Sequence, residues 1–203
     1  MARTDRKPRQ RLDPSERRAA ILNAATHAFA SLPYGDVTIA SIATDVQASS
    51  ALVYRYFANK EDLYVEVVRL AIQDLRARHR AAIHALPDGA PVRDRIRAAT
   101  EVYLDHIASH PNAWAMPMRQ PGGEPPAAAD LRTKARMAYV EALVQLLEPS
   151  TERRHEYALW GYFGFLDSAC LRWVDEGCPP DDRWPLIDTA TGALEGALGD
   201  WSA

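Results

Sequence analysis

The sequence has little of what several classes of protein require. Cysteine occurs only at Cys170 and Cys178 among 203 residues, a number that fits neither a disulfide framework nor a cysteine zinc cage. No run approaches the roughly 18 apolar residues of a membrane-spanning helix. A glycine-rich phosphate loop, a nucleophile elbow and an HExxH motif are also missing. We therefore predict a protein without a membrane segment, a cofactor or an enzymatic activity.

Alternating strand patterns with hairpin turns are absent as well, whereas apolar residues recur at helical spacing along most of the chain. The stretch Asp13-Pro14-Ser15-Glu16 has the residue types of a helix N-terminus and predicts a first helix to about residue 31. Further long helices are predicted from about residue 59 to 86 and over 91–109, 126–147, 151–176 and 183–201, between segments rich in proline and glycine. The sequence thus predicts an all-α protein.

Charge is distributed unevenly along the chain. Residues 1–60 contain nine Lys and Arg against five Asp and Glu, while the remaining residues contain fifteen against twenty-two. A basic first third on an acidic body is typical of a polyanion-binding module attached to a partner-binding body, although basic tails also act as solubilising arms. A secretory signal has an apolar stretch after its basic residues, but none follows the arm from Arg3 to Arg11. We therefore expect a cytoplasmic protein.

Two short helices are predicted after the first long one. Thr38 is a good N-cap for a helix of about two turns to Asp45, and Ser49 or Ser50 can cap a second one that runs to about Tyr56. Neither is long enough to fold alone. Two short helices across a tight turn, docked on a longer helix, predict a three-helix helix-turn-helix domain at residues 1–60. Residues 61–203 form a larger helical domain in this interpretation.

The stretch from Thr38 to Leu63 resembles the DNA-binding segment of the TetR family of bacterial transcriptional regulators. The resemblance rests on Ile42-Ala43, Ser49, Tyr54-x-Tyr56-Phe57 and Lys60-Glu61-x-Leu63, which have the spacing of that family's signature. It implies a dimeric, all-helical regulator whose body holds a cavity for an inducing ligand. The turn departs from the family pattern, because Val46-Gln47-Ala48 stands where Ala-Gly-Val is usual. Gln47 is therefore expected to adopt a left-handed or strained backbone conformation.

A recognition helix needs short polar residues at its start and longer groups facing the groove. Arg55 is the one residue there that can bond guanine O6 and N7 together, so we predict that it reads the sequence. Tyr54 occupies a position that commonly contacts phosphate in the family. Lys60, in the first turn of a helix, opposes the helix dipole and indicates a nearby anion, either a phosphate or the adjacent Glu61 and Asp62. The predicted DNA-binding residues are Thr38, Ser49, Ser50, Leu52, Tyr54, Arg55, Tyr56 and Lys60.

The body offers candidates for a dimer interface and a ligand pocket. The segment 157–166 is uncharged around its whole circumference, which favours a helix buried on more than one side, and the last helix repeats apolar residues at nearly 3.5-residue spacing. The predicted dimer interface comprises Gly161, Gly164, Phe165, Ile187, Leu194 and Leu198. A loop-rich segment at 114–118 and nearby aromatic residues predict a pocket lined by Tyr103, Trp114, Met118, Tyr139, Trp160 and Phe163. The alternatives are a monomer and plain core packing.

His106 and His110 lie one helical turn apart, a spacing that metals use, but no third ligand is evident and a solvated face is predicted instead.

The features of the sequence together predict a homodimeric regulator that binds double-stranded operator DNA, represses transcription, and is released by a small lipophilic or aromatic effector. The alternative is an α-helical ligand-binding or scaffold protein that retains the helix-turn-helix module without binding DNA.

Overall fold

The computed structural model describes residues 13–147 and 150–199, and every helix or strand assigned in these ranges is a helix. The prediction of an all-α protein is confirmed. The α-helices are α1 (Pro14–Ser31), α2 (Ile39–Asp45), α3 (Ser50–Tyr54), α4 (Lys60–His84), α5 (Val92–Ser109), α6 (Pro111–Arg119), α7 (Pro126–Leu146), α8 (Arg153–Asp175) and α9 (Arg183–Leu198). Two short 3-10 helices, η1 (Tyr34–Asp36) and η2 (Pro180–Asp182), complete the list. The basic arm from Arg3 to Arg11 lies outside the described residues.

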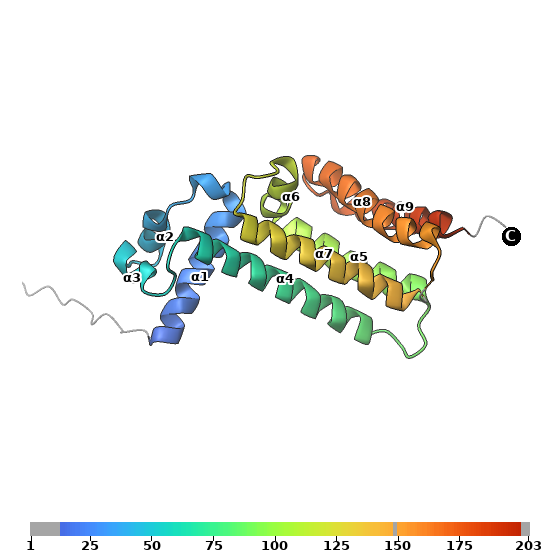
Figure 1. Cartoon of the computed structure of the whole chain (residues 1–203), viewed down its shortest axis with the longest axis horizontal. Coiled ribbons are helices and arrows are strands. Elements are labelled where there is room, and N and C mark those ends of the chain that lie inside the picture. Colours follow the sequence, from blue (N-terminus) through green and yellow to red (C-terminus); the bar gives the residue numbers. More distant parts are fainter. Residues whose placement is uncertain (1–12, 148–149, 200–203) are drawn as a thin grey trace, which may run out of the picture.

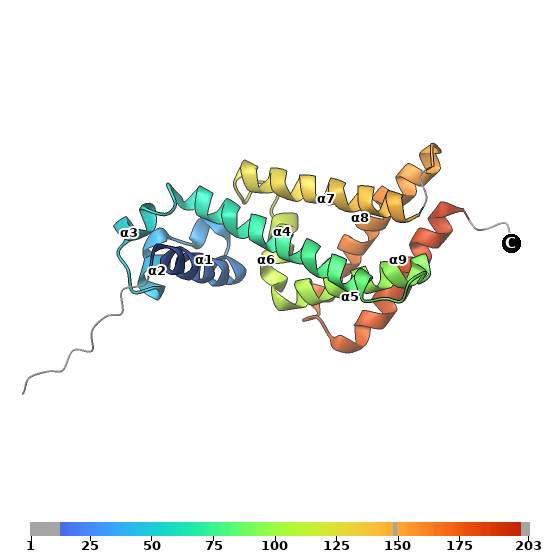
Figure 2. The same cartoon turned by 90° about the horizontal axis from the view of Figure 1, so that it is seen from below.

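The molecule is elongated, with α1, α2 and α3 at one end and α8 and α9 towards the other (Figure 1). Helix α4 begins beside α3 and runs along the molecule past α7 and α5 (Figures 1 and 2). It contacts α1 near its start and α5 and α7 over its length. One continuous helix therefore joins the two ends of the protein.

The N-terminal cluster of buried residues holds α1, α2, α3 and the first half of α4 together. Ile21, Ile42, Val53 and Leu63 are completely buried in it. The helices begin where their capping residues predict. Asp13 accepts hydrogen bonds from the backbone N–H groups of Ser15 and Glu16, and the Glu16 carboxylate accepts one from the N–H of Asp13. These short-range bonds satisfy N–H groups that the first turn of a helix leaves free.

The body packs around a second cluster, formed by residues of α5 to α9. Leu104, Ile107, Leu159 and Cys170 are completely buried there. Helices α8 and α9 pack closely against each other, and α5 packs against both. Within the described residues, no helix combines the length and the apolar character needed to cross a membrane.

The segment predicted to be loop-rich, from Trp114 to Met118, is instead part of helix α6. Helix α6 contains two prolines, one at its start and one in its interior. Pro111 occupies the first helical position, where a missing N–H needs no partner. Pro117 lies inside the helix and costs a backbone hydrogen bond. Because Trp114 and Ala115 are buried in the body's core, tertiary packing compensates for the lost bond.

Candidate DNA-binding surface

The α2–turn–α3 unit is held by local hydrogen bonds. The Thr38 hydroxyl accepts from the Ser41 N–H at 3.0 Å, and the Ser49 hydroxyl accepts from the Leu52 N–H at 3.2 Å, so both predicted N-caps are confirmed. The turn closes through the Ala48 N–H, which donates to the Ala43 carbonyl at 2.8 Å. Gln47 has a φ of 51°, which confirms the predicted left-handed conformation.

Replacing Gln47 with glycine should stabilise the protein. A left-handed conformation costs a residue with a Cβ about 1–2 kcal/mol, so glycine relieves this strain in the folded state. The greater conformational freedom of glycine in the unfolded chain offsets part of the stabilisation. The expected increase in the free energy of unfolding is about 0.5–1 kcal/mol. Urea unfolding measures it, with Gln47→Ala as the control that keeps the strain. A Gln47→Gly variant no more stable than Gln47→Ala would contradict the prediction.

Helix α3 buries one side and exposes the other. Val53 is completely buried and Phe57 nearly so, whereas Tyr54 is 51% exposed. Ser49, Tyr54 and Arg55 are all exposed, and Ser50, Leu52 and Tyr56 are partly buried. Arg55 is the C-cap of the helix, and among the described residues it has no ion-pair partner. The exposed side thus carries hydroxyl groups and one unpaired guanidinium, the groups that DNA-binding helices present to bases and phosphates.

Lys60 has partners within the chain that sequence reasoning missed. Its Nζ donates to the carbonyl oxygens of Tyr34 at 2.6 Å and Val37 at 2.8 Å, and it lies 4.2 Å from the centroid of the Tyr34 ring. The partial negative charge of these carbonyl oxygens stabilises the ammonium. The ammonium is therefore held against η1, and neither Glu61 nor Asp62 is its partner. The phosphate contact of Lys60 stays a prediction.

The predicted pocket residues gather only in part. Trp114 of α6 donates from Nε1 to the Tyr103 hydroxyl at 2.9 Å, and both residues pack in the cluster that also includes Met118 and Phe163. Tyr139 lies elsewhere, in edge-to-face contact with His79 of α4, and its buried hydroxyl has no hydrogen-bond partner. Trp160 is 42% exposed on α8. The structure thus brings four of the six residues together.

Two charged residues, which no sequence motif singled out, contact members of the body's cluster. The carboxylate of Asp167 on α8 accepts a hydrogen bond from the Tyr103 hydroxyl at 3.0 Å and forms an ion pair with Arg136 of α7. Burial, followed by the negative charge of Asp167, raises the pKa of Tyr103 well above its usual value. No local pattern could have revealed this pair, because the two residues lie on different helices.

The predicted dimer residues differ in their exposure to solvent. Gly161, Gly164 and Phe165 are exposed on α8, and a Cβ added at either glycine would meet no atom within 4 Å. Ile187 and Leu194 are only 3% and 2% exposed, since they face α8 and the rest of the body's core. They have no area to offer a partner, and we remove them from the interface. Leu198 is partly buried.

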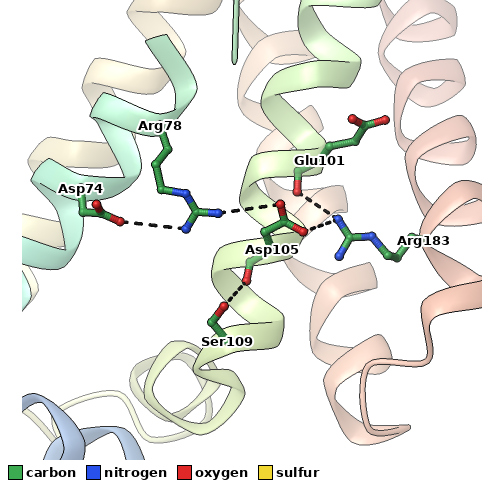
Figure 3. Close-up of polar contacts among 6 residues, drawn as sticks. All are labelled: Asp74, Arg78, Glu101, Asp105, Ser109 and Arg183. Carbon is green, nitrogen blue, oxygen red and sulfur yellow. Dashed lines mark hydrogen bonds and ion pairs between the residues drawn. The ribbon is translucent and has the colours of Figure 1, made fainter. Parts of the chain in front are cut away.

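A polar cluster ties α4 to α5 and α9 (Figure 3). Asp105 of α5 accepts a hydrogen bond from Arg183 Nη2 at 2.7 Å, and its other oxygen lies 3.8 Å from Arg78 Nη2 of α4. Arg183, the first residue of α9, also donates to the Glu101 carbonyl at 3.2 Å. Such exposed ion pairs contribute little to stability. They nevertheless connect α4, through Asp105 of α5, to α9.

The two histidines on α5 differ in their surroundings. His110 is exposed, as a solvated face requires, whereas His106 is partly buried. Burial, and then the nearby His110, lowers the pKa of His106 to about 4. Among the residues that the structure describes, no three His, Cys, Asp or Glu side chains come together as metal ligands would.

The chain is similar to known regulators over both parts. Residues 21–67 match the family model described as bacterial regulatory proteins of the tetR family. The HTH-type transcriptional regulator BetI of Agrobacterium fabrum is 27% identical over 181 residues, which are 89% of this chain and 74% of that protein. The HTH-type transcriptional activator FasR of Mycolicibacterium smegmatis is 32% identical over 97 residues, 48% of this chain and 43% of its own length.

Solved structures show the same fold. A tetR-family transcriptional regulator from Streptomyces coelicolor superposes with a TM-score of 0.74 at 24% identity, covering 92% of this chain and 80% of its own. The similarity extends over the helical body as well as the helix-turn-helix unit. These findings do not favour the alternative of a scaffold that has lost DNA binding.

Proposed function

This chain belongs to the TetR family of bacterial transcriptional regulators, and we propose that it acts as a dimeric repressor that a small effector releases from its operator. The observation that carries the proposal is the exposed side of the α2–turn–α3 unit, where Ser49, Tyr54 and Arg55 face solvent over a buried apolar base. We assign DNA binding to residues 1–60 and effector binding and dimerisation to residues 61–203, in the cytoplasm, where the DNA is.

In the proposed complex, α3 enters the major groove. Arg55 bonds guanine O6 and N7, and Leu52 contacts a thymine methyl group. Tyr54 and Tyr56 place their hydroxyls on phosphates, as do the capping residues Thr38, Ser49 and Ser50 and the ammonium of Lys60. The lone guanidinium carries most of the sequence readout because the other exposed groups are short or neutral.

A single α3 reads few base pairs, so the proposal requires two copies. The exposed side of α8 is suited to the contact, because it combines two glycines with large apolar side chains. Tyr157, Trp160 and Phe165 are all among the exposed large hydrophobic residues. Exposed apolar area of this kind marks an interaction surface. In the proposed dimer, α8 and α9 of each copy form a four-helix bundle through Gly161, Gly164, Phe165 and Leu198.

The effector is proposed to act through α6. Trp114 of α6 and Tyr103 belong to the aromatic cluster where a lipophilic or aromatic effector would bind. On its other side, α6 contacts α1 of the DNA-binding domain. A ligand that shifts α6 would change the separation of the two α3 helices and so favour a state with weak operator affinity. Repression needs only occupancy of a promoter, with no further contact to the transcription machinery.

Selection of bound fragments from the host genome tests the proposed function. We expect enrichment of one inverted repeat whose half-sites lie one or more helical turns apart, each with a guanine at a fixed position. A reporter gene behind this sequence should be expressed more strongly when the regulator is removed. Fragments without a shared motif, or binding equal to that of bulk DNA at every salt concentration, would refute the proposal.

A further inference from the structure

The ion pair between Asp167 and Arg136 lies among the aromatic residues of the body. Asp167 is the more buried partner, with a side chain that is 13% exposed, against 36% for Arg136. The Tyr103 hydroxyl bonds one carboxylate oxygen of Asp167, and Arg136 Nη2 bonds the other. Every described hydrogen bond to this carboxylate thus comes from a neutral phenol or from a guanidinium that is itself partly in solvent.

Aromatic rings border the position of the guanidinium. The Cζ atom of Arg136 lies 5.9 Å from the centroid of the Phe163 ring, and Phe163 packs edge-to-face on Tyr162 at 5.4 Å. Trp114 holds the Tyr103 hydroxyl from the other side. A buried carboxylate beside aromatic rings is a favourable environment for a cation with an apolar body, since rings attract cations and the carboxylate neutralises them.

The two partners differ in what it costs to displace them. An anionic ligand that bound Arg136 in place of Asp167 would leave the Asp167 carboxylate without its counter-charge, which is strongly unfavourable for a largely buried group. Expelling Arg136 costs little by comparison, because its long side chain already reaches solvent and can be rehydrated. Replacement of Arg136 by another cation keeps the site neutral throughout. A ligand can therefore replace the Arg136 guanidinium beside Asp167 if the ligand is itself a cation.

We propose that Asp167, Tyr103 and Phe163 form the binding site of a small organic cation that has N–H donors and an apolar body, and that this cation displaces the guanidinium of Arg136. The inference rests on the proposed function, because it names the chemical class of the effector. Arg136 occupies the site in the free protein and competes with the ligand. Its release breaks the link between α7 and α8, while the Tyr103–Trp114 hydrogen bond transmits the change to α6.

Benzylguanidinium is a suitable probe, since it carries the head group of Arg136 on an aromatic body, and benzylurea is its neutral counterpart. Calorimetry at pH 8, without DNA, measures the binding of both compounds. Arg136→Met removes the internal competitor, so we expect it to bind benzylguanidinium at least about tenfold more tightly than the original protein. The compound should also raise the melting temperature of this variant, because it restores a partner to Asp167. Benzylurea should do neither.

Two further variants complete the test. Lys134→Met removes an exposed cation from the same helix and should leave the affinity for benzylguanidinium unchanged. Asp167→Asn removes the counter-charge, so a folded Asp167→Asn protein should lose at least about tenfold in affinity. The affinities of Asp167→Asn and the original protein for benzylguanidinium test the site even if Arg136→Met does not fold. Unchanged affinity in Asp167→Asn, no gain in a folded Arg136→Met, or equal binding of benzylurea would overturn the proposal.

The outcome is independent of whether the protein binds DNA. Operator affinity is measured separately, without ligand, on the original protein. Cation binding without any operator binding would reject the proposed function and leave the site in place. Operator binding without any cation binding would reject the site alone.

Discussion

Replacing Gly164 with arginine is expected to split the proposed dimer and to lower operator affinity by at least about a hundredfold. Linking two binding modules raises the overall affinity by two to four orders of magnitude, and a monomer loses that gain. The variant can keep its fold, because a side chain at Gly164 would point into open space within the single chain. In the proposed dimer, a large charged group there would face α8 of the other copy.

Sedimentation gives the mass of the Gly164→Arg variant, circular dichroism its helicity, and a titration with operator DNA its affinity. Ala77→Arg is the matched control, because Ala77 is exposed on α4, away from α8. The control should remain dimeric and bind DNA normally. A Gly164→Arg protein that is still dimeric and retains its operator affinity would show that the interface lies elsewhere.

Replacing Glu124 with alanine is expected to lower the free energy of unfolding by about 1–3 kcal/mol, the cost of leaving the buried Tyr64 hydroxyl without its acceptor. The side chain of Glu124 is only 8% exposed. Its carboxylate accepts a hydrogen bond from the Tyr64 hydroxyl at 2.8 Å, and Arg132 Nε approaches both of its oxygens at 3.2 Å. Removal of the carboxylate leaves a phenol and a guanidinium without their acceptor.

The loss should also affect the packing of α1 and η1. The Tyr64 ring packs edge-to-face on Phe29 of α1 at 4.8 Å and lies 5.0 Å from the Tyr34 ring. Urea unfolding at a fixed protein concentration measures the effect, since a dimer's stability depends on concentration. Glu141→Ala, at an exposed position of α7, is the control and should change stability by less than about 0.5 kcal/mol. A similarly small effect in Glu124→Ala would contradict the role of this carboxylate.

The parts of the fold that were predictable depend on short-range interactions. Asp13, Thr38, Ser49 and Asn59 each accept a hydrogen bond from an N–H two or three residues later, so the residue type at the helix start reveals the cap. The left-handed turn at Gln47 was predictable from the family resemblance, because that family usually has glycine at this position. Helix α6 escaped prediction because packing in the body's core outweighs its two prolines.

The sites in the body were less predictable, because periodicity alone does not say which side of a helix faces its own chain. Ile187 and Leu194 share the spacing of an interface helix, but they are buried within one chain. Partners that are distant in sequence were missed altogether. The Asp167–Arg136 pair and the carbonyls that hold Lys60 depend on how separate elements pack together, and no local pattern encodes such contacts.

Arg55 is proposed to read a guanine in the major groove, and a cycle of two substitutions measures this contact. Operator affinity is measured for the original protein and for Arg55→Ala, each on the selected operator and on one with the contacted guanine replaced. Arg80→Ala, at an exposed position of α4, controls for the loss of a positive charge. We expect that Arg55→Ala loses about 1–3 kcal/mol of binding free energy on the operator, keeps its nonspecific binding, and no longer distinguishes the two sequences. An Arg55→Ala protein that retains the full preference for the guanine would contradict it.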